Sequence, residues 1–344
     1  MMRRVGRAIA ICLTLFSGAA MAETTYTLLD FSDLNGWAED DHSAAFTAFK
    51  ETCDLMSDPE WTTLCNLAND VSDARGFFEL FFKPVMVTDG EPMLFTGYFE
   101  PELRGSLQRT ATFRYPIYRL PSALPPTGPW LTRQEIEENG ALASQGLEIA
   151  WLADPVDRFF LQVQGSGRIR LQDGSVIRVG YAGNNRRPYS SIGQELIRRG
   201  IYSEHQVSAT VIRNWVRNNP DEGRALLWTN ESYVFFRNVT EVPAEKGPLG
   251  AMNRSISAMR SIAVDPAYTT LGAPVWIERH GANAMNRLMI AQDTGSAIKG
   301  AQRADIFIGT GVEAGLEAGE IKDTGRMITL LPIQMAYALV PEVI

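Results

Sequence analysis

Residues 290–311 have the sequence IAQDTGSAIKGAQRADIFIGTG, which places two carboxylates around a glycine-rich loop. Asp293 precedes the loop, Lys299 lies within it, and Asp305 opens an apolar run at 306–308 that predicts a short strand. A carboxylate beside such a run is a candidate for a raised pKa, which a general acid working near neutral pH requires. Local sequence leaves a second interpretation open, in which Asp293 caps a turn and Asp305 is a solvated residue at a strand edge.

The chain has 344 residues, of which 45% are hydrophobic and 21% charged, a composition typical of one large or two ordinary globular domains. Residues 1–22 have the features of a secretory signal peptide: a basic start, a short apolar stretch and a small-x-small cleavage site. A short N-terminal anchor is the alternative. Without this segment the formal charge changes from −8 to −11, because three arginines leave and all 40 acids stay. Such an acidic chain is a poor candidate for binding nucleic acid or anionic membranes.

Three cysteines are present. Cys12 lies in the signal segment after Ile11, where a lipoprotein signal needs a small residue, so we expect no lipid attachment. Cys53 and Cys65 remain in a chain that we expect to be exported. A disulfide and two free buried thiols are both compatible with this pair.

The spacing of apolar residues predicts helices over 41–83 and a strand over 93–102. Alternation of Phe159, Leu161 and Val163 predicts a further strand that ends at the glycines of 165–167. A hairpin that turns at Asp173-Gly174 follows. Three capping motifs predict helices: a short one from Thr132 to about Ala143, one from Ser191 to Gly200, and one from Ser203 to Asn219-Pro220. In the last third, short strands are predicted at 275–277, 288–291, 305–308 and 326–331.

Several kinds of chemistry are excluded. The histidines His42, His205 and His280 are far apart and have no metal-ligand spacing, so we expect neither a metal nor a cofactor. Ser166 is not part of a G-x-S-x-G nucleophile motif. The pattern Gly309-x-Gly311-x-x-Ala314 resembles a dinucleotide fingerprint, but too little chain follows, and we expect a strand–turn–helix connection instead.

The best alternative enzyme is an aspartic-protease-like hydrolase. The stretch Asp293-Thr294-Gly295-Ser296 matches the D-T-G-S loop of that class, and Asp323 begins a second D-T-G. A protease dyad needs two carboxylates that share one proton and come from two similar lobes. Thirty residues between the two motifs are far fewer than a lobe needs.

The chain resembles the lytic murein transglycosylase A family, whose members carry a 3D domain. The resemblance begins at about Met93 and rests on several motifs in the expected order. These are Thr96-Gly97-Tyr98-Phe99-Glu100-Pro101, Tyr115-Pro116-Ile117-Tyr118-Arg119, Val163-Gln164-Gly165-Ser166-Gly167, Tyr181-Ala182-Gly183-Asn184-Asn185, Ser191-Ile192-Gly193, Asn230-Glu231-Ser232-Tyr233-Val234-Phe235-Phe236, Asp293-Thr294-Gly295-Ser296-Ala297-Ile298-Lys299-Gly300, and Arg303-Ala304-Asp305 with Gly309.

The resemblance implies a mainly β fold with N-terminal helices. A double-psi β-barrel catalytic domain would contain residues 23–105 and 230–344, and a smaller β-rich substrate-binding domain, residues 106–229, would be inserted between them. The substrate would lie in a groove between the two domains.

The resemblance also implies cleavage of the β-1,4 bond between N-acetylmuramic acid and N-acetylglucosamine, with a 1,6-anhydromuramoyl end as product. Because the C6 hydroxyl of the sugar is the nucleophile, one carboxyl suffices as acid and base, where ordinary glycosidases need two. Asp305 matches that catalytic residue, Asp293 has a supporting role, and Lys299 stabilises the loop or a substrate oxygen. A peptidoglycan-binding protein without activity is the second hypothesis.

Candidate groove residues are Tyr98, Glu100, Gln164, Gly165, Ser166 and Gly167. Glu100 stands where the family commonly has threonine, which would put an extra acid near the groove. We expect a soluble periplasmic monomer, or one associated with the outer membrane, that binds peptidoglycan glycan strands. The sequence identifies no partner among cell-wall synthesis or division proteins.

Overall fold

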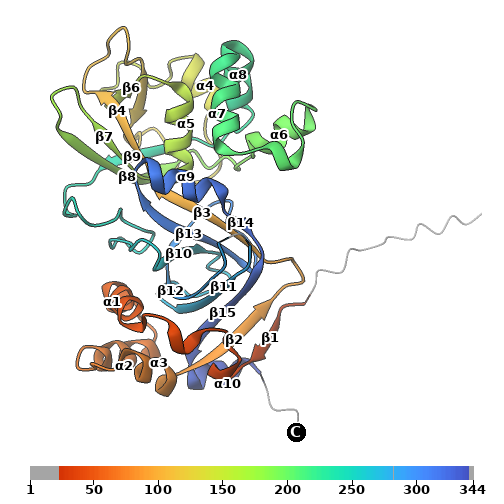
Figure 1. Cartoon of the computed structure of the whole chain (residues 1–344). Coiled ribbons are helices and arrows are strands. Elements are labelled where there is room, and N and C mark those ends of the chain that lie inside the picture. The colour runs from red at the N-terminus through yellow and green to blue at the C-terminus, as the bar shows by residue number, and fades with distance from the viewer. Residues whose placement is uncertain (1–22, 282, 341–344) are drawn as a thin grey trace, which may run out of the picture.

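The computed structural model describes residues 23–281 and 283–340, so the predicted signal peptide at 1–22 lies outside the described residues. Within these ranges the chain forms two β-sheets, each accompanied by helices (Figure 1). The prediction of a mainly β protein with N-terminal helices is confirmed. None of the described helices is both long enough and apolar enough to cross a membrane.

The larger sheet is built from both ends of the chain (Figure 1). In spatial order, its nine described strands are β1 (Thr25–Leu28), β2 (Phe82–Thr88), β15 (Gly325–Pro332), β11 (Pro274–Arg279), β12 (Met285–Thr294), β10 (Ser261–Val264), β13 (Arg303–Thr310), β3 (Leu94–Glu100) and β14 (Lys322–Asp323). Most neighbours are antiparallel, but β10 runs parallel to β12, and β13 runs parallel to β3. The four strands predicted in the last third of the chain are confirmed as parts of β11, β12, β13 and β15.

Three helices occupy most of the stretch predicted to be helical at 41–83. They are α1 (His42–Cys53), α2 (Pro59–Ala68) and α3 (Ala74–Phe81). Each begins after an aspartate whose side chain accepts a backbone hydrogen bond from the first turn, which satisfies an N–H group that has no partner within the helix. Their apolar faces share one buried cluster with β2 and β15. A disulfide joins Cys53 of α1 to Cys65 of α2, whose Cα atoms are 5.4 Å apart, so this alternative for the cysteine pair is the one found.

The smaller sheet comes from the middle of the chain. In spatial order, its six described strands are β5 (Tyr115–Tyr118), β6 (Glu148–Leu152), β4 (Glu102–Ser106), β7 (Gly167–Arg170), β8 (Val176–Asn184) and β9 (Val234–Asn238). Five helices accompany it: α4 (Arg133–Glu138), α5 (Pro155–Gln164), α6 (Ile192–Arg198), α7 (Ala209–Asn218) and α8 (Pro220–Trp228). The segment 106–229 was predicted to be β-rich, but it holds all five helices. The predicted boundaries also assigned β4 and β9 to the larger domain, whereas both pair within the smaller sheet. For β4 the reason is that the chain passes from one sheet to the other at Pro101.

Helix α5 replaces the strand that was predicted through residues 159–163. Asp154 accepts a hydrogen bond from the N–H of Val156, and Pro155 occupies the first helical position, so the helix has a strong start. Gly165 ends it in the left-handed conformation, with φ of 77°. The alternation of apolar residues in this short stretch misled the prediction, and these capping residues were the better signal. The hairpin predicted at Asp173-Gly174 is confirmed between β7 and β8.

Helix α9 (Val312–Glu320) packs across β3 where the two sheets meet (Figure 1). It follows β13, which confirms the predicted strand–turn–helix connection. The close packing depends on Gly97 of β3, because a Cβ atom there would lie 2.8 Å from the Cα of Ala318. The remaining described helical elements are α10 (Ile333–Leu339) and the 3-10 helices η1 (Phe31–Asp33), η2 (Trp37–Glu39) and η3 (Glu204–Gln206).

Candidate active site

One row of residues crosses four neighbouring strands of the larger sheet. The register pairs Asp293 of β12 with Ala263 of β10. It then pairs Ala263 with Asp305 of β13, and Asp305 with Thr96 of β3. Because laterally paired residues point to the same face of a sheet, these four side chains lie on one face. The backbones of the two aspartates are two strand spacings apart, or about 10 Å.

The opposite face of the same strands is apolar. Phe95, Ile262 and Ile306, each adjacent in sequence to a member of the row, are fully buried in one cluster. Side chains alternate along a strand, so the packing of this face determines which residues face the other way. The burial of Ile306 therefore fixes the side of the sheet on which Asp305 lies.

Asp305 ends a hydrogen-bond chain with a defined direction. Its Oδ1 accepts a hydrogen bond from the Thr96 hydroxyl over 2.6 Å, and the Arg303 guanidinium donates to the same hydroxyl oxygen over 2.8 Å. Since arginine only donates, the Thr96 proton is left to point at the carboxylate. Burial raises the pKa of Asp305, while the Thr96 hydrogen bond and the Arg303 charge oppose the rise. A raised pKa lets a carboxyl keep its proton at higher pH, as a general acid requires.

Asp293 is held by three donors. Its Oδ2 accepts from the Tyr98 hydroxyl over 2.9 Å, and its Oδ1 accepts from the N–H groups of Ala251 and Thr294 over 3.0 and 2.9 Å. Burial raises the pKa of Asp293 to about 6 even though these hydrogen bonds lower it, and the charge of Asp305 adds to the rise. Asp293 thus ties the chain around Ala251 to the start of the glycine-rich loop.

A groove between the two sheets passes both aspartates. Its wider part has a volume of about 390 Å³ and is lined by Asp293 and by residues of α5, β8 and β9. Its narrower part, of about 120 Å³, is lined by Asp305 together with Arg133 and Tyr189. Gly295 and Ser296 line both parts, which makes the groove continuous along the glycine-rich loop.

Three of the predicted groove residues line this groove. Gln164, Gly165 and Ser166 lie at its wider part, where α5 ends. The side-chain oxygen of Gln164 accepts a hydrogen bond from the N–H of Phe99 over 2.9 Å, which joins the two sheets at this point. Tyr98 is buried and contacts the groove through its hydrogen bond to Asp293.

Glu100 does not line the groove, which corrects its prediction as a substrate-facing acid. Its side chain is fully buried, with carboxylate oxygens 2.9 Å from Arg168 and 3.1 Å from Arg178. The hydroxyl of Thr310 donates a further hydrogen bond over 2.9 Å. Glu100 is therefore the centre of a polar joint between the two sheets, closed to a ligand.

Two more predicted residues contact other parts of the molecule. A Cβ atom at Gly167 would collide with the side chain of Leu161, so this glycine serves the packing of β7 against α5. The Lys299 side chain is 65% exposed, and its ammonium lies 3.5 Å from Asp265, which also accepts a hydrogen bond from the N–H of Gly300. Lys299 therefore contacts Asp265, which supports the loop, and contacts neither Asp293 nor Asp305.

The two D-T-G motifs do not meet. Asp323 of the second motif lies on β14, opposite Phe95, and its carboxylate is 3.5 Å from Arg279. Asp293 and Asp305 each have their own hydroxyl donor, Tyr98 and Thr96. The arrangement does not form the shared-proton pair that an aspartic protease requires.

The chain is similar to known families and proteins. The family model described as the MltA specific insert domain matches residues 94–237, and that of the 3D domain matches residues 260–331. Membrane-bound lytic murein transglycosylase A of Vibrio cholerae is 36% identical over 264 residues, which cover 73% of this chain and 69% of that protein. The protein of the same name from Escherichia coli K12 is 38% identical, over 69% of this chain and 65% of its own length.

This chain belongs to the lytic murein transglycosylase A family. Solved structures of the family agree with its fold. A membrane-bound lytic murein transglycosylase from Agrobacterium tumefaciens superposes with a TM-score of 0.82 and 32% identity, over 92% of this chain and 99% of that one. E. coli MltA with bound chitohexaose gives a TM-score of 0.73 and 29% identity, over 89% and 94% of the two chains.

The sequence analysis did not predict, as site residues, the two residues that interact with Asp305. Thr96 and Arg303 both lie inside motifs that carried the resemblance, but neither is a catalytic residue type by itself. Tyr181, Ser232 and Arg237, which line the wider part of the groove, were missed for the same reason. The only signal for them was their place in or next to such motifs.

Proposed function

We propose that this protein is a peptidoglycan lytic transglycosylase. It cleaves the β-1,4 bond between N-acetylmuramic acid and N-acetylglucosamine and leaves a 1,6-anhydromuramoyl end. The observation that carries the proposal is Asp305, a carboxyl with a raised pKa in the narrow part of a groove between two sheets. Family membership supports the substrate class, and a relative has been solved with bound chitohexaose, an oligosaccharide.

The reaction uses one carboxyl twice. Protonated Asp305 gives its proton to the glycosidic oxygen as the bond from that oxygen to C1 of the muramoyl residue breaks. The C6 hydroxyl of the same residue then attacks C1, and its proton passes to the Asp305 carboxylate. Asp305 ends protonated, as it began, and no water is consumed. The Arg303 charge and the Thr96 hydroxyl stabilise the carboxylate between the two transfers.

Asp293 acts as a supporting residue in this proposal. Two of its three hydrogen bonds fix the backbone at Ala251 and at Thr294, and the third holds the Tyr98 hydroxyl. Its negative charge, when ionised, also favours a proton on Asp305 and a positive charge developing at C1. Lys299 contributes through the loop, by its contact with Asp265.

The finer description of fold and location is part of the same proposal. We infer that the larger sheet is a double-psi β-barrel, which its parallel pairs β10–β12 and β13–β3 support. The division into a catalytic domain and an inserted substrate-binding domain follows the two sheets. We place the enzyme in the periplasm, where peptidoglycan lies and where the disulfide between Cys53 and Cys65 would be stable.

The test is mass spectrometry of sacculi digested by the wild type and by Asp305→Asn. The wild type is expected to release anhydromuropeptides, and the variant to release none while it still binds isolated glycan strands. Activity retained in the variant would show that Asp305 is not the acid. Products with added water would indicate a hydrolase, and binding without any product would indicate a peptidoglycan-binding protein.

A further inference from the structure

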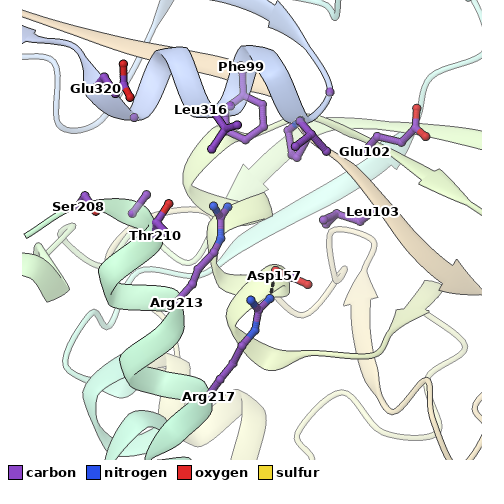
Figure 2. A pocket seen from close by; sticks show the side chains of 16 residues that line it. Phe99, Glu102, Leu103, Asp157, Ser208, Thr210, Arg213, Arg217, Leu316 and Glu320 are labelled. Atoms are coloured by element: carbon purple, nitrogen blue, oxygen red, sulfur yellow. Dashed lines mark hydrogen bonds and ion pairs between the residues drawn. The ribbon is translucent and has the colours of Figure 1, made fainter.

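A second cavity lies on the other side of β3 from the groove, between α9 on one side and α5 and α7 on the other (Figure 2). Its volume is about 470 Å³. Tyr98 and Phe99 are neighbours on β3, so their side chains point to opposite faces: Tyr98 reaches Asp293 at the groove, and Phe99 lines this cavity. We call it the rear cavity; the residues used below are Phe99, Asp157, Arg213, Val312, Leu316 and Glu320.

Arg213 supplies a positive charge to the rear cavity. Its guanidinium lies over the ring of Phe160, 4.3 Å from the centroid, and Figure 2 shows it pointing from α7 toward Phe99 and Leu316. Its Nε is buried without a hydrogen-bond partner, and no carboxylate of the described residues pairs with it. Burial lowers the pKa of Arg213, and Asp157 opposes that effect without an ion pair. A half-buried guanidinium without a paired carboxylate gains free energy from an anionic ligand in the cavity.

The neighbouring arginine of α7, Arg217, differs from Arg213 in that it is paired with carboxylates. Arg217, one turn further along α7, is 2.6 Å from Asp154 and 3.1 Å from Asp157. Its charge is therefore neutralised within the protein. The first turn of α7, at Ser208 and Thr210, also lines the cavity, and a helix start adds positive potential to that of Arg213.

The side of the cavity formed by α9 is apolar. Val312 is 74% exposed and Leu316 is 59% exposed, and both face the cavity together with Phe99. Glu320 lines the cavity at the end of the same helix. The lining therefore suits a short chain that combines carboxylates, small apolar side chains and an amino group, and the volume suits a ligand of a few residues.

We propose that the rear cavity binds the short acidic peptide carried by peptidoglycan, with one of its carboxylates on Arg213 and its apolar side chains against Val312 and Leu316. This inference rests on the proposed function, because it takes peptidoglycan as the substrate. The unpaired Arg213 favours an occupant with a carboxylate, and Glu102 and Glu320, which also line the cavity, favour one that carries an amino group as well. With glycan in the groove and peptide behind β3, the enzyme would hold one polymer at two points, which raises its apparent affinity.

The first experiment measures binding of the tetrapeptide released from peptidoglycan by an amidase, using calorimetry on the full mature chain. The wild type is expected to bind it, and Arg213→Gln to bind at least about tenfold more weakly, the size of one charge-assisted hydrogen bond. Arg198→Gln is the matched control, because Arg198 is a 72% exposed arginine on α6 outside the cavity. No binding by the wild type, or equal binding by Arg213→Gln, would overturn the proposal.

A second variant guards against a folding defect in the first. Leu316→Glu changes an exposed residue and places a negative charge in the cavity, so it is expected to lose peptide binding while its melting temperature stays unchanged. An all-L peptide of similar composition is the comparison ligand. If it bound as tightly as the peptidoglycan tetrapeptide, the cavity would be a site for a protein segment, and the proposal would be wrong.

Kinetics separate this inference from the proposed function. On peptide-bearing glycan, Arg213→Gln is expected to raise KM several-fold and leave kcat unchanged. On glycan stripped of peptides it is expected to match the wild type. A wild type that makes no anhydro product from either substrate would contradict the proposed function alone, since the calorimetric result does not depend on catalysis. An equal rise of KM on both substrates would contradict the peptide site.

Discussion

The Thr96 hydroxyl lies between the guanidinium of Arg303 and the carboxyl of Asp305. It accepts a hydrogen bond from Arg303 and donates one to Asp305. Thr96→Val keeps the shape of the side chain and removes this link. The Asp305 carboxylate then loses a charge-assisted hydrogen bond, so kcat is expected to fall roughly tenfold or more. Because that hydrogen bond lowers the pKa of Asp305, its loss raises the pKa, and the alkaline limb of the kcat profile moves to higher pH.

The measurement is kcat against pH on isolated glycan strands. Thr96→Ser restores the hydroxyl and is expected to recover most of kcat and the position of the limb. A valine variant with lower kcat but an unmoved alkaline limb would mean that Thr96 has a packing role and does not position Asp305.

Asp293 makes stability depend on pH in a direction opposite to that of most aspartates. Its pKa is about 6 in the folded protein, against an ordinary aspartate value of 3.8 that we take for the unfolded chain. Between these values the folded chain holds a proton that the unfolded chain has lost. The contribution of Asp293 to stability therefore falls as pH rises from about 4 to about 6, by on the order of 2–3 kcal/mol, and is level above that.

Asp293→Asn removes this titration. The difference in free energy of unfolding, variant minus wild type, is expected to grow by about 2–3 kcal/mol between pH 4 and pH 7. Denaturant titrations at four or five pH values measure it, and groups that do not interact with Asp293 cancel in the difference. A difference that stays constant with pH would contradict the raised pKa.

At the residue scale, the sequence predicted different roles for Asp293 and Asp305 but did not identify the residues that hydrogen-bond to them. Thr96 and Asp305 are 209 residues apart, and the contact depends on the parallel pairing of β3 with β13. No local pattern encodes such a register. The family motifs contained both residues, which is why the resemblance came closer to the site than the periodicity did.

At the scale of the elements, the packing of α9 on β3 depends on Gly97, which has no side chain. Gly97→Ala would place a Cβ atom 2.8 Å from the Cα and 3.0 Å from the carbonyl oxygen of Ala318. Backbone cannot move aside as a flexible side chain can, so the variant is expected to lose about 1–3 kcal/mol of stability. Denaturant unfolding measures the loss.

Gly319→Ala in α9 is the matched control. A Cβ atom there would meet no atom within 4 Å, and alanine is the better helix former, so this variant is expected to gain up to about 1 kcal/mol. Equal effects of the two substitutions would mean that α9 does not pack on β3 as described.

Element type was predictable where caps and turns were decisive. Apolar residues at helical spacing follow Asp41 and Asp58, which begin the first two N-terminal helices, and Asp173-Gly174 turns the hairpin. Helix α5 was missed because three alternating apolar residues fit a strand as well as one side of a short helix. Its Asp154-Pro155 start carried the correct signal.

At the scale of the whole molecule, Glu100 links the two sheets through its ion pairs with Arg168 and Arg178. Glu100→Gln would leave the buried guanidinium of Arg178 and the half-buried one of Arg168 without their carboxylate. Breaking a buried pair in this way is expected to cost about 3–5 kcal/mol. Differential scanning calorimetry measures the loss and shows whether the two sheets begin to unfold separately.

Glu102→Gln tests the same chemistry two residues away. Glu102 pairs with Arg170 at the surface, with 34% and 49% of the two side chains exposed, so about 1 kcal/mol or less is expected. Comparable losses in the two variants would contradict a buried joint at Glu100. The sequence could not show that Glu100 is buried and Glu102 exposed, because the arginines that pair with them are about 70 residues away along the chain.

The alternation of faces in β13 also determines where the chain can change its length. One residue inserted into this strand ahead of Asp305 would turn that carboxyl into the apolar cluster and present Ile306 to the groove. The loop at 295–299 lies between β12 and β13, so a change in its length would leave both strands in register. Its residues belong to a motif shared with the family, and Gly295 and Ser296 line the groove beside both aspartates. Related chains are therefore expected to keep the length of this loop as well as that of the strand.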